Sequence, residues 1–287
     1  MKRTAIRYSF LIMLILPLFA HGQASMKMSA GQVDAARWIE TRFARGKVPP
    51  FSFVYGDKSS KSLLPGWNYS MKRLPGDDPD VVKYLYTYTE RPSGLKVECF
   101  VTGFPAFDAV EWVLHFTNTG KSDSRVLEQV KVVDLDMQAP AAGDFTLYYA
   151  DGNHISKEDF HPRTTVPFRM APEGGRSSQG DFLPFFNLTA PSGKEGVVVG
   201  IGWTGMWYAD LTKTGDRGAT LVSGMKTMRL YLHPDESIRT PSISLMFWNG
   251  DDRMAGHNRF RRFVLAHHTR KVDGQMQKYP LCSGFNY

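Results

Sequence analysis

A long succession of strand-like segments, from residue 51 to residue 248, constrains the fold of this 287-residue chain more than any other feature. In residues 82–89, Tyr84, Tyr86 and Tyr88 fall at every second position, with Leu85 and Thr87 between them. In residues 109–117, Trp112, Leu114 and Phe116 alternate with Val113 and His115. Such alternation is typical of strands that bury one face. The same pattern recurs in residues 127–135, 144–149, 196–203, 228–233 and 242–248.

Turn-forming residues separate these segments. Glycine, proline, asparagine and aspartate gather at residues 92–94, 118–120, 151–152, 191–193, 215–216 and 249–250. No helical pattern lies between the strands, which excludes the alternation of strands and helices that a parallel sheet requires. We therefore expect a mainly β fold, a large antiparallel β-supersandwich with one short helix before it and one helix after it.

The two expected helices lie at residues 30–44 and 253–268. In the first, Ala35, Trp38, Ile39 and Phe43 recur at helical spacing, and Gly46 follows as a stop signal. In the second, Phe260, Phe263, Val264 and His267 form one apolar stripe, with arginines around it. Asp251 and Asp252 precede this helix, where an acidic side chain can accept hydrogen bonds from free backbone N–H groups.

Residues 1–24 have the pattern of a secretory signal peptide. Lys2, Arg3 and Arg7 are followed by an apolar run that is too short to span a membrane, and then by small residues. We expect export to the periplasm or the extracellular space, with no membrane association after cleavage. Loss of the three cations would lower the net charge from +7 to +4, so we expect no nucleic-acid partner. In that setting Cys99 and Cys282 either form a disulfide or stay as free thiols.

The sequence contains few candidates for catalysis. Glycosidases normally need two carboxylates beside the scissile bond. Asp134 and Asp136 share one face of an expected strand, but such pairs also arise freely where a strand meets a polar rim. We favour the structural interpretation, and we expect no catalytic residues in this chain. No nucleotide-binding or nucleophile-elbow motif occurs, and we expect no cofactor.

The sequence also contains possible ligands for a metal ion. The possible ligands cluster within eleven residues: Asp151, Asn153, His154, Asp159 and His161. A calcium-binding loop requires glycine at its sixth position, where this segment has Ser156, and no helical histidine pair suits zinc. We therefore expect no metal.

Residues 174–188 combine glycines, hydrogen-bonding side chains and aromatic rings. Glycines allow close backbone approach, and aromatic rings can stack on a pyranose while polar groups bind its hydroxyls. A second glycine-rich segment with two tryptophans follows at residues 200–207. We predict that these segments face a carbohydrate or a neighbouring catalytic domain through Arg176, Ser177, Asp181, Trp203 and Trp207. The alternative is that both tryptophans pack in the core, as tryptophan usually does.

These residues also carry a family resemblance. The chain resembles the N-terminal domain of α-galactosidases of glycoside hydrolase family 36. The strings that carry the resemblance are Gly174-Gly-Arg-Ser-Ser, Ile201-Gly-Trp-Thr-Gly, Gly103-Phe-Pro-Ala, Leu232-His-Pro-x-Glu-x-Ile-Arg-Thr-Pro and Gly256-His-Asn-Arg-Phe. The resemblance implies a β-supersandwich that precedes a (β/α)8 barrel, and the barrel holds both catalytic carboxylates in that family. A barrel takes about 250 residues, and only 19 follow His268, so we expect that it is missing here.

The resemblance implies a domain at residues 25–250 and, at 251–287, a helix and linker that would lead into the barrel. We expect a non-catalytic N-terminal domain, or a truncated form, of an exported α-galactosidase-like hydrolase. Its partners would be an α-galactoside or other carbohydrate, the barrel, and a second copy of the chain in a homo-oligomer. Two alternatives stay open: a free-standing carbohydrate-binding protein, and a complete small enzyme such as a lyase or mutarotase.

Overall fold

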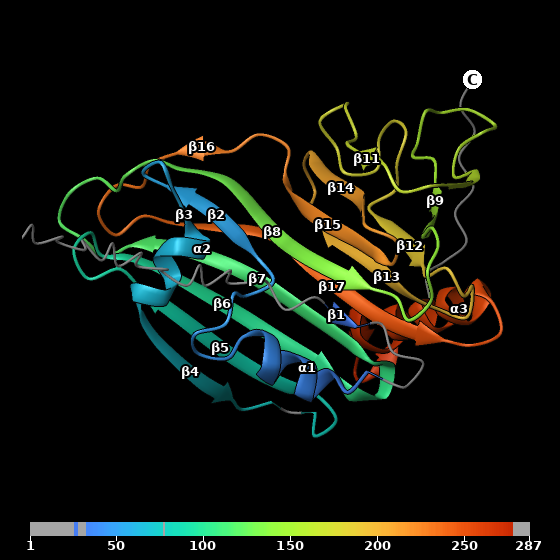
Figure 1. Cartoon of the computed structure of the whole chain (residues 1–287), viewed down its shortest axis with the longest axis horizontal. Coiled ribbons are helices and arrows are strands. Elements are labelled where there is room, and N and C mark those ends of the chain that lie inside the picture. The colour runs from blue at the N-terminus through green and yellow to red at the C-terminus, as the bar shows by residue number, and fades with distance from the viewer. Residues whose placement is uncertain (1–25, 28–32, 77, 278–287) are drawn as a thin grey trace, which may run out of the picture.

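Two large sheets packed face to face form the molecule, and the core lies between them (Figure 1). The computed structural model describes residues 26–27, 33–76 and 78–277. Among the strands of these described residues, all the pairings are antiparallel except that of β1 with β8. The predicted mainly β sandwich is therefore confirmed.

The eight-stranded sheet has the order β11-β14-β15-β8-β2-β3, and β1 and β16 also pair with β8. Its strands are β1 (Met26–Lys27), β2 (Ser52–Tyr55), β3 (Lys58–Ser59), β8 (Leu127–Gln138), β11 (Arg169–Met170), β14 (Trp207–Thr214), β15 (Gly218–Met225) and β16 (Arg229–Leu230).

The nine-stranded sheet has the order β10-β9-β12-β13-β17-β7-β6-β5-β4. Its strands are β4 (Asn68–Leu74), β5 (Val82–Thr89), β6 (Leu95–Phe104), β7 (Ala109–Asn118), β9 (Thr146–Ala150), β10 (Pro162–Thr165), β12 (Phe185–Thr189), β13 (Glu195–Gly202) and β17 (Ser237–Asn249). A small separate pair joins β18 (Lys271–Val272) to β19 (Gln275–Met276).

The alternation in the sequence matches the burial in the strands. Tyr84, Tyr86 and Tyr88 all point into the core, as do Trp112, Leu114 and Phe116. Trp112 Nε1 donates a hydrogen bond to the carbonyl oxygen of Val132, 2.7 Å away, which connects the two sheets through the core.

Helix α1 (Ala35–Arg42) packs against β6 and β7, and its predicted apolar stripe is buried. The Trp38 ring stacks on Trp112 with centroids 6.1 Å apart. The helix is shorter than the predicted 30–44, since it begins after the N-cap Asp34 and ends at Arg42. Short helical segments follow at α2 (Ser60–Leu63), η1 (Leu64–Gly66) and η2 (Pro105–Phe107).

Helix α3 (Arg253–Phe263) begins where it was predicted. The Asp252 carboxylate accepts a hydrogen bond from the Met254 N–H at 2.7 Å, which confirms this residue as the N-cap. The helix continues as a π-helical turn over Val264–His268. Phe263 is buried in a second apolar cluster, on the outer side of the nine-stranded sheet.

The strand predicted at 228–233 is wrong in extent. Only β16 (Arg229–Leu230) pairs with a neighbour. Beyond it two backbone N–H groups bond to side chains: Leu232 N–H donates to Ser124 Oγ, and His233 N–H donates to Glu236. For these two groups a side-chain acceptor replaces the neighbouring strand, and alternation in the sequence does not predict that.

Asp134 and Asp136 make structural contacts. Asp134 is buried, and its Oδ2 accepts a hydrogen bond from Ser52 Oγ at 2.6 Å and lies 2.8 Å from Lys61 Nζ. Asp136 accepts a hydrogen bond from Thr220 Oγ1 at 2.5 Å. Both carboxylates are thus engaged within the eight-stranded sheet and its edge.

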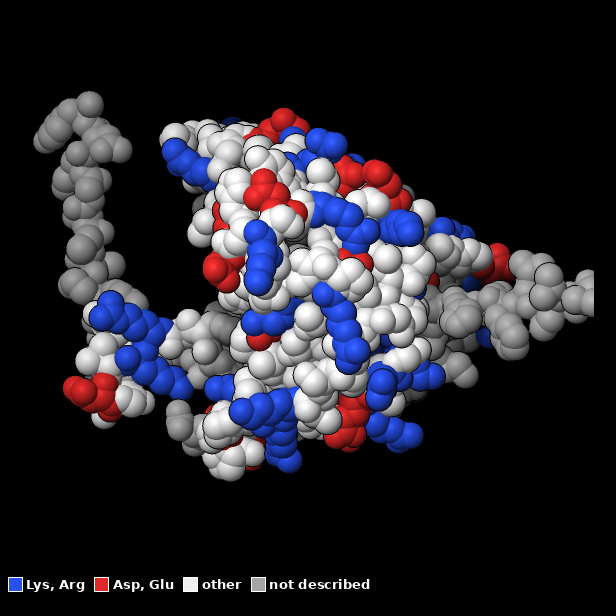
Figure 2. Space-filling model, turned by 90° about the vertical axis from the view of Figure 1, so that its left-hand side faces the viewer, with Lys and Arg blue, Asp and Glu red and all other residues white. Residues whose placement is uncertain are grey.

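Charged side chains of both signs occupy the end of the molecule that carries β3 and β16, where basic groups are more widely spread than acidic ones (Figure 2). Among the described residues, no helix has the length and apolarity needed to cross a membrane. Cys99 is buried in the core, whereas the predicted signal peptide and Cys282 lie outside the described residues.

Candidate functional site

The candidate site is a pocket that two irregular loops line. Both loops lie at the end of the molecule opposite β3 and β16 (Figure 1). We call this pocket the loop pocket. It has a volume of about 660 Å³, and its lining comes from residues 153–160 and 174–183. The lining residues are Asn153, His154, Ile155, Phe160, Gly174, Arg176, Ser178, Gln179, Gly180 and Leu183.

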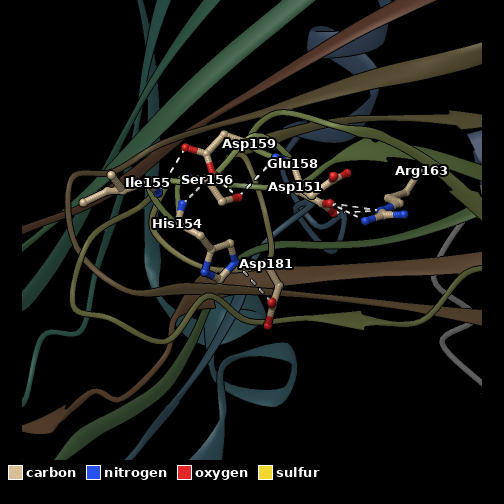
Figure 3. Close-up of polar contacts among 8 residues, drawn as sticks. All are labelled: Asp151, His154, Ile155, Ser156, Glu158, Asp159, Arg163 and Asp181. Atoms are coloured by element: carbon tan, nitrogen blue, oxygen red, sulfur yellow. Dashed lines mark hydrogen bonds and ion pairs between the residues drawn. The ribbon is translucent and has the colours of Figure 1, made fainter.

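The first loop connects β9 to β10 and is closed at its base by an ion pair. Arg163 donates to both carboxylate oxygens of Asp151, with Nη2 at 2.7 Å from Oδ2. The backbone N–H of Asp151 also donates to His161 O at 3.0 Å. Figure 3 shows this pair beside the Asp159 cluster. The base is therefore fixed, and the loop projects from a defined point.

Asp159 organises the tip of this loop. Its carboxylate accepts hydrogen bonds from the backbone N–H groups of His154, Ile155 and Ser156, at 2.8, 3.1 and 3.3 Å (Figure 3). The bond from His154 is the main cause that lowers the pKa of Asp159. Asn153, His154 and Asp159, which the sequence offered as possible metal ligands, therefore bond to one another and shape the loop. Among the described residues, no group of three or more such side chains could hold a metal ion.

Two apolar side chains of this loop are exposed and have unusual backbone geometry. Ile155 has φ 61° and is 93% exposed, and Phe160 has φ 62° and is 56% exposed. Positive φ is rare for non-glycine residues and is costly for a β-branched one. A strained backbone that holds apolar groups toward solvent at the edge of a pocket is typical of a binding site.

Backbone contacts join the second loop to the first. Asn153 N–H donates to Ser178 O at 2.8 Å, and Gly180 N–H donates to Asn153 O at 3.3 Å. Gly152 allows this approach, since a Cβ there would lie 2.4 Å from the carbonyl oxygen of Gly180. The loop pocket is thus built by close packing of two loops that are separated in the sequence by β10 and β11.

The predicted site residues divide into two groups. Arg176 is exposed and lines the loop pocket, and the exposed Asp181 lies 3.6 Å from His154 Nε2. Ser177 supports the loop through its backbone: its N–H donates to Thr204 O, and its carbonyl accepts from Trp207 Nε1 at 2.8 Å.

Neither tryptophan lines the loop pocket. Trp207 is fully buried, so it presents no free face to a sugar ring or a neighbouring domain, and the alternative that it packs in the core holds for this ring. Trp203 is partly buried and packs against the core. The physical reason is that both segments return into the sandwich, where a large ring gains more from burial than from exposure.

Sequence reasoning overlooked Phe160, the exposed ring of the pocket. Its signal in the sequence is weak: Ile155 and Phe160 are isolated apolar residues in an otherwise polar stretch between two strands. An apolar residue in a polar loop can equally fold back onto the core, and only the position of the loop distinguishes the two outcomes.

The fold is similar to that of known structures, although the sequence has diverged. No protein-family model and no curated protein sequence matches the chain. The α-galactosidase from Lactobacillus brevis aligns with a TM-score of 0.58 and 15% identity, over 76% of this chain and 31% of that chain.

The chain shares its fold with part of the family 36 α-galactosidases. The GH36 α-galactosidase AgaA from Geobacillus stearothermophilus aligns with a TM-score of 0.52 and 17% identity, over 71% of this chain and 30% of that one. The galactosidase domain of the α-galactosidase-sucrose kinase AgaSK aligns with a TM-score of 0.57 and 13% identity, over 79% of this chain and 34% of that one. The chain thus corresponds to about a third of the length of these enzymes, which agrees with the resemblance stated from the sequence.

Proposed function

We propose that this chain is a non-catalytic β-supersandwich module of an α-galactosidase-like glycoside hydrolase, and that its loop pocket faces carbohydrate. The observation that carries the proposal is the fold match to α-galactosidases, which covers most of this chain but only about a third of theirs. Variants of AgaA have been solved in complex with stachyose and raffinose, so sugars of this class are the first candidates.

The contacts of Asp134, Asp136 and Asp159 support a non-catalytic role. A glycosidase needs a general acid with a raised pKa and a second carboxylate across the scissile bond. Asp134 is bonded to Ser52 and Lys61, and Asp136 to Thr220. The pKa of Asp159 is lowered by backbone N–H groups, which is the opposite of what an acid catalyst requires.

The loop pocket offers the groups that a neutral sugar needs. A pyranose has an apolar C–H face, for which the exposed Phe160 ring is available, and hydroxyl groups that both donate and accept. Arg176 and Gln179 line the same pocket and can bind those hydroxyls. In a full enzyme, such a pocket would hold a part of the substrate away from the reacting bond.

A second candidate is a free-standing carbohydrate-binding protein. It is favoured by one observation: hydrogen bonds within this chain hold together the two loops that line the pocket. A module that shares its site with a barrel should bind free sugar weakly, roughly in the millimolar range, whereas a free-standing binder should reach roughly micromolar affinity. Calorimetric titration of the purified chain with raffinose separates the two.

The deciding experiment combines binding and turnover. We expect saturable raffinose binding to be weakened about tenfold in Phe160→Ala, since the ring supplies the stacking surface. Phe100→Ala removes an exposed ring from β6 and serves as the matched control, with unchanged affinity. Absence of binding by the folded chain at millimolar sugar would overturn the role of the loop pocket.

For turnover, we expect no hydrolysis of an aryl α-galactoside by the purified chain. Activity that disappears in Asp134→Asn or Asp136→Asn would contradict the non-catalytic assignment. We further propose that the protein is exported, on the basis of the pattern in residues 1–24.

A further inference from the structure

A groove separate from the loop pocket lies between helix α3 and the outer face of the nine-stranded sheet. It has a volume of about 860 Å³, within the range of small-molecule sites. Its floor includes two cross-strand pairs of small residues, Gly200 with Ser244 and Gly202 with Ser242. Because these residues carry little or no side chain, the helix and the sheet leave a hollow between them.

The walls of the groove are apolar and open to solvent. Phe185 is 43% exposed, Met254 46% and Leu265 42%, although apolar residues of this size are otherwise mostly buried in the molecule. The rings of Phe185 and Phe260 lie side by side, with centroids 6.1 Å apart. An apolar ligand that covers these side chains would remove their surface from water, which is favourable.

A buried donor without a partner lies in the lining of the groove. Asn187 is only 1% exposed, and its Oδ1 accepts a hydrogen bond from Trp248 Nε1 at 2.9 Å. An indole N–H can only donate, so the amide oxygen must face Trp248 and the amide nitrogen must face elsewhere. Among the described residues, Asn187 Nδ2 and Ser244 Oγ, on the floor of the groove, have no hydrogen-bond partner. A ligand that brings an acceptor would remove the cost of this unsatisfied donor.

A cation lies at the end of the groove where Asn187 is found. The Arg253 guanidinium stacks over the ring of Tyr148, 4.7 Å from its centroid, and Tyr148 is the cross-strand neighbour of Asn187. Arg253 forms no ion pair within the described residues. Glu111, an acidic group of the lining, is paired with His268 Nε2 at 2.8 Å. Among the described residues, the guanidinium that Arg253 brings to the end of the groove near Asn187 is therefore not held in an ion pair.

We propose that this groove binds a small amphipathic carboxylate. The apolar body lies along Phe185 and Phe260, and the carboxylate accepts hydrogen bonds from Asn187 Nδ2 and Arg253. The proposal is independent of the sugar-binding role, because the two sites share no lining residue.

Calorimetric titration with octanoate, with octan-1-ol as its neutral counterpart, tests the proposal on the full chain. We expect one saturable octanoate site and at least about tenfold weaker binding of the alcohol, because only the carboxylate engages the guanidinium. Equal affinity for the two probes, or no octanoate binding by the folded chain, would overturn the proposal.

Two arginines of helix α3 provide a matched pair of variants. Arg253→Gln should weaken octanoate binding about tenfold and leave octan-1-ol binding unchanged. Arg261 also lines the groove but lies eight residues further along, about 12 Å at 1.5 Å per residue, so Arg261→Gln should change octanoate affinity by less than about twofold. Equal losses in both variants would indicate general attraction to a basic surface and would contradict the assigned site.

Filling the hollow gives an independent check. Ser244→Leu places an apolar side chain on the floor and should abolish binding of both probes, with the fold checked by circular dichroism. If that variant does not fold, the Arg253 and Arg261 pair still decides the outcome, since both side chains are exposed. Phe160→Ala, in the loop pocket, should leave octanoate binding unchanged, which separates failure here from failure of the sugar-binding role.

Discussion

At the scale of single residues, Asp134 illustrates how a polar group serves the fold. It lies on β8 and is almost fully buried. Its carboxylate accepts a hydrogen bond from Ser52 of β2 and forms an ion pair with Lys61 of α2. Removal of one partner from a buried polar group leaves the others unsatisfied, and this costs more than the net value of the bond.

We therefore predict that Asp134→Ala lowers the free energy of unfolding by about 2–3 kcal/mol, measured by urea denaturation. Asp136→Asn should cost only about 1 kcal/mol, since Asp136 is less buried and keeps an oxygen that can accept from Thr220. Equal and small effects in both variants would show that the Asp134 contacts contribute little.

Gly152 acts at the same scale, but on the loop pocket. Its missing side chain lets the carbonyl oxygens of Ser178 and Gly180 approach within 2.6 and 2.4 Å of where a Cβ would stand. Both neighbours are backbone atoms, so the loops would have to separate. We predict that Gly152→Ala destabilises the protein by about 1–3 kcal/mol and weakens raffinose binding.

The matched control is Gly66→Ala, which has open space around the added methyl group. It should change stability by less than about 1 kcal/mol and leave sugar affinity unaltered. Normal raffinose affinity in Gly152→Ala would mean that the pocket does not depend on contact between the two loops.

At the scale of elements, an ion pair joins the end of β5 to the segment before β8, and so joins the two sheets. Arg125 Nη2 lies 2.5 and 2.6 Å from the Glu90 carboxylate oxygens, and its guanidinium also stacks over Tyr55 of β2, 4.3 Å from the ring centroid. Burial raises the pKa of Glu90, but hydrogen bonds from Arg125 and Ser93 outweigh it and lower that pKa below its ordinary value of 4.5.

The sign of the pH dependence follows. Because the pKa of Glu90 is lower in the folded state, its contribution to stability is fully present above pH 4.5 and is lost as the pH falls through the folded value. We predict that Glu90→Gln is less stable than the native protein at pH 7 by about 1 kcal/mol, and that the difference shrinks in acid. Urea denaturation at pH 7, 4.5 and 3 measures this, and a difference that grows in acid would contradict it.

At the scale of the whole molecule, Cys99 reports on the integrity of the sandwich. It lies on β6 between Tyr86 and Leu114 of the neighbouring strands and is fully buried. Burial raises the pKa of the Cys99 thiol well above its usual value, so the reactive thiolate is scarce in the folded state.

We predict that Cys99, in a Cys282→Ser background, reacts with a thiol reagent only through global unfolding. The labelling rate should rise with urea in parallel with the loss of the β signal in circular dichroism. Rapid labelling in the absence of urea would show that the sheets separate locally around β6.

The residues also show how far sequence reasoning reached. The alternation at Tyr84, Tyr86 and Tyr88 was sufficient to place a strand and its buried face. Side chains of a strand alternate between its two faces, so only one register buries all three rings. The cap at Asp252 was equally local, since it depends on one side chain and the next N–H groups. The burial of Trp207 was left open, because glycine-rich surroundings are compatible with exposure and with burial alike.

The sequence by itself therefore determined the class of fold, the strands with regular alternation, the helix start at Asp252 and the similarity to family 36 α-galactosidases, since all of these depend on local spacing or short strings. Only the tertiary structure decided which residues line a site. It brought Phe160 and Arg176 together across two loops and buried Trp207, and it left Asn187 Nδ2 without a partner in the part of the chain that the structure describes. The physical reason is that burial and pairing depend on which segments meet across the sandwich, and contacts between distant segments leave no periodic trace in the sequence.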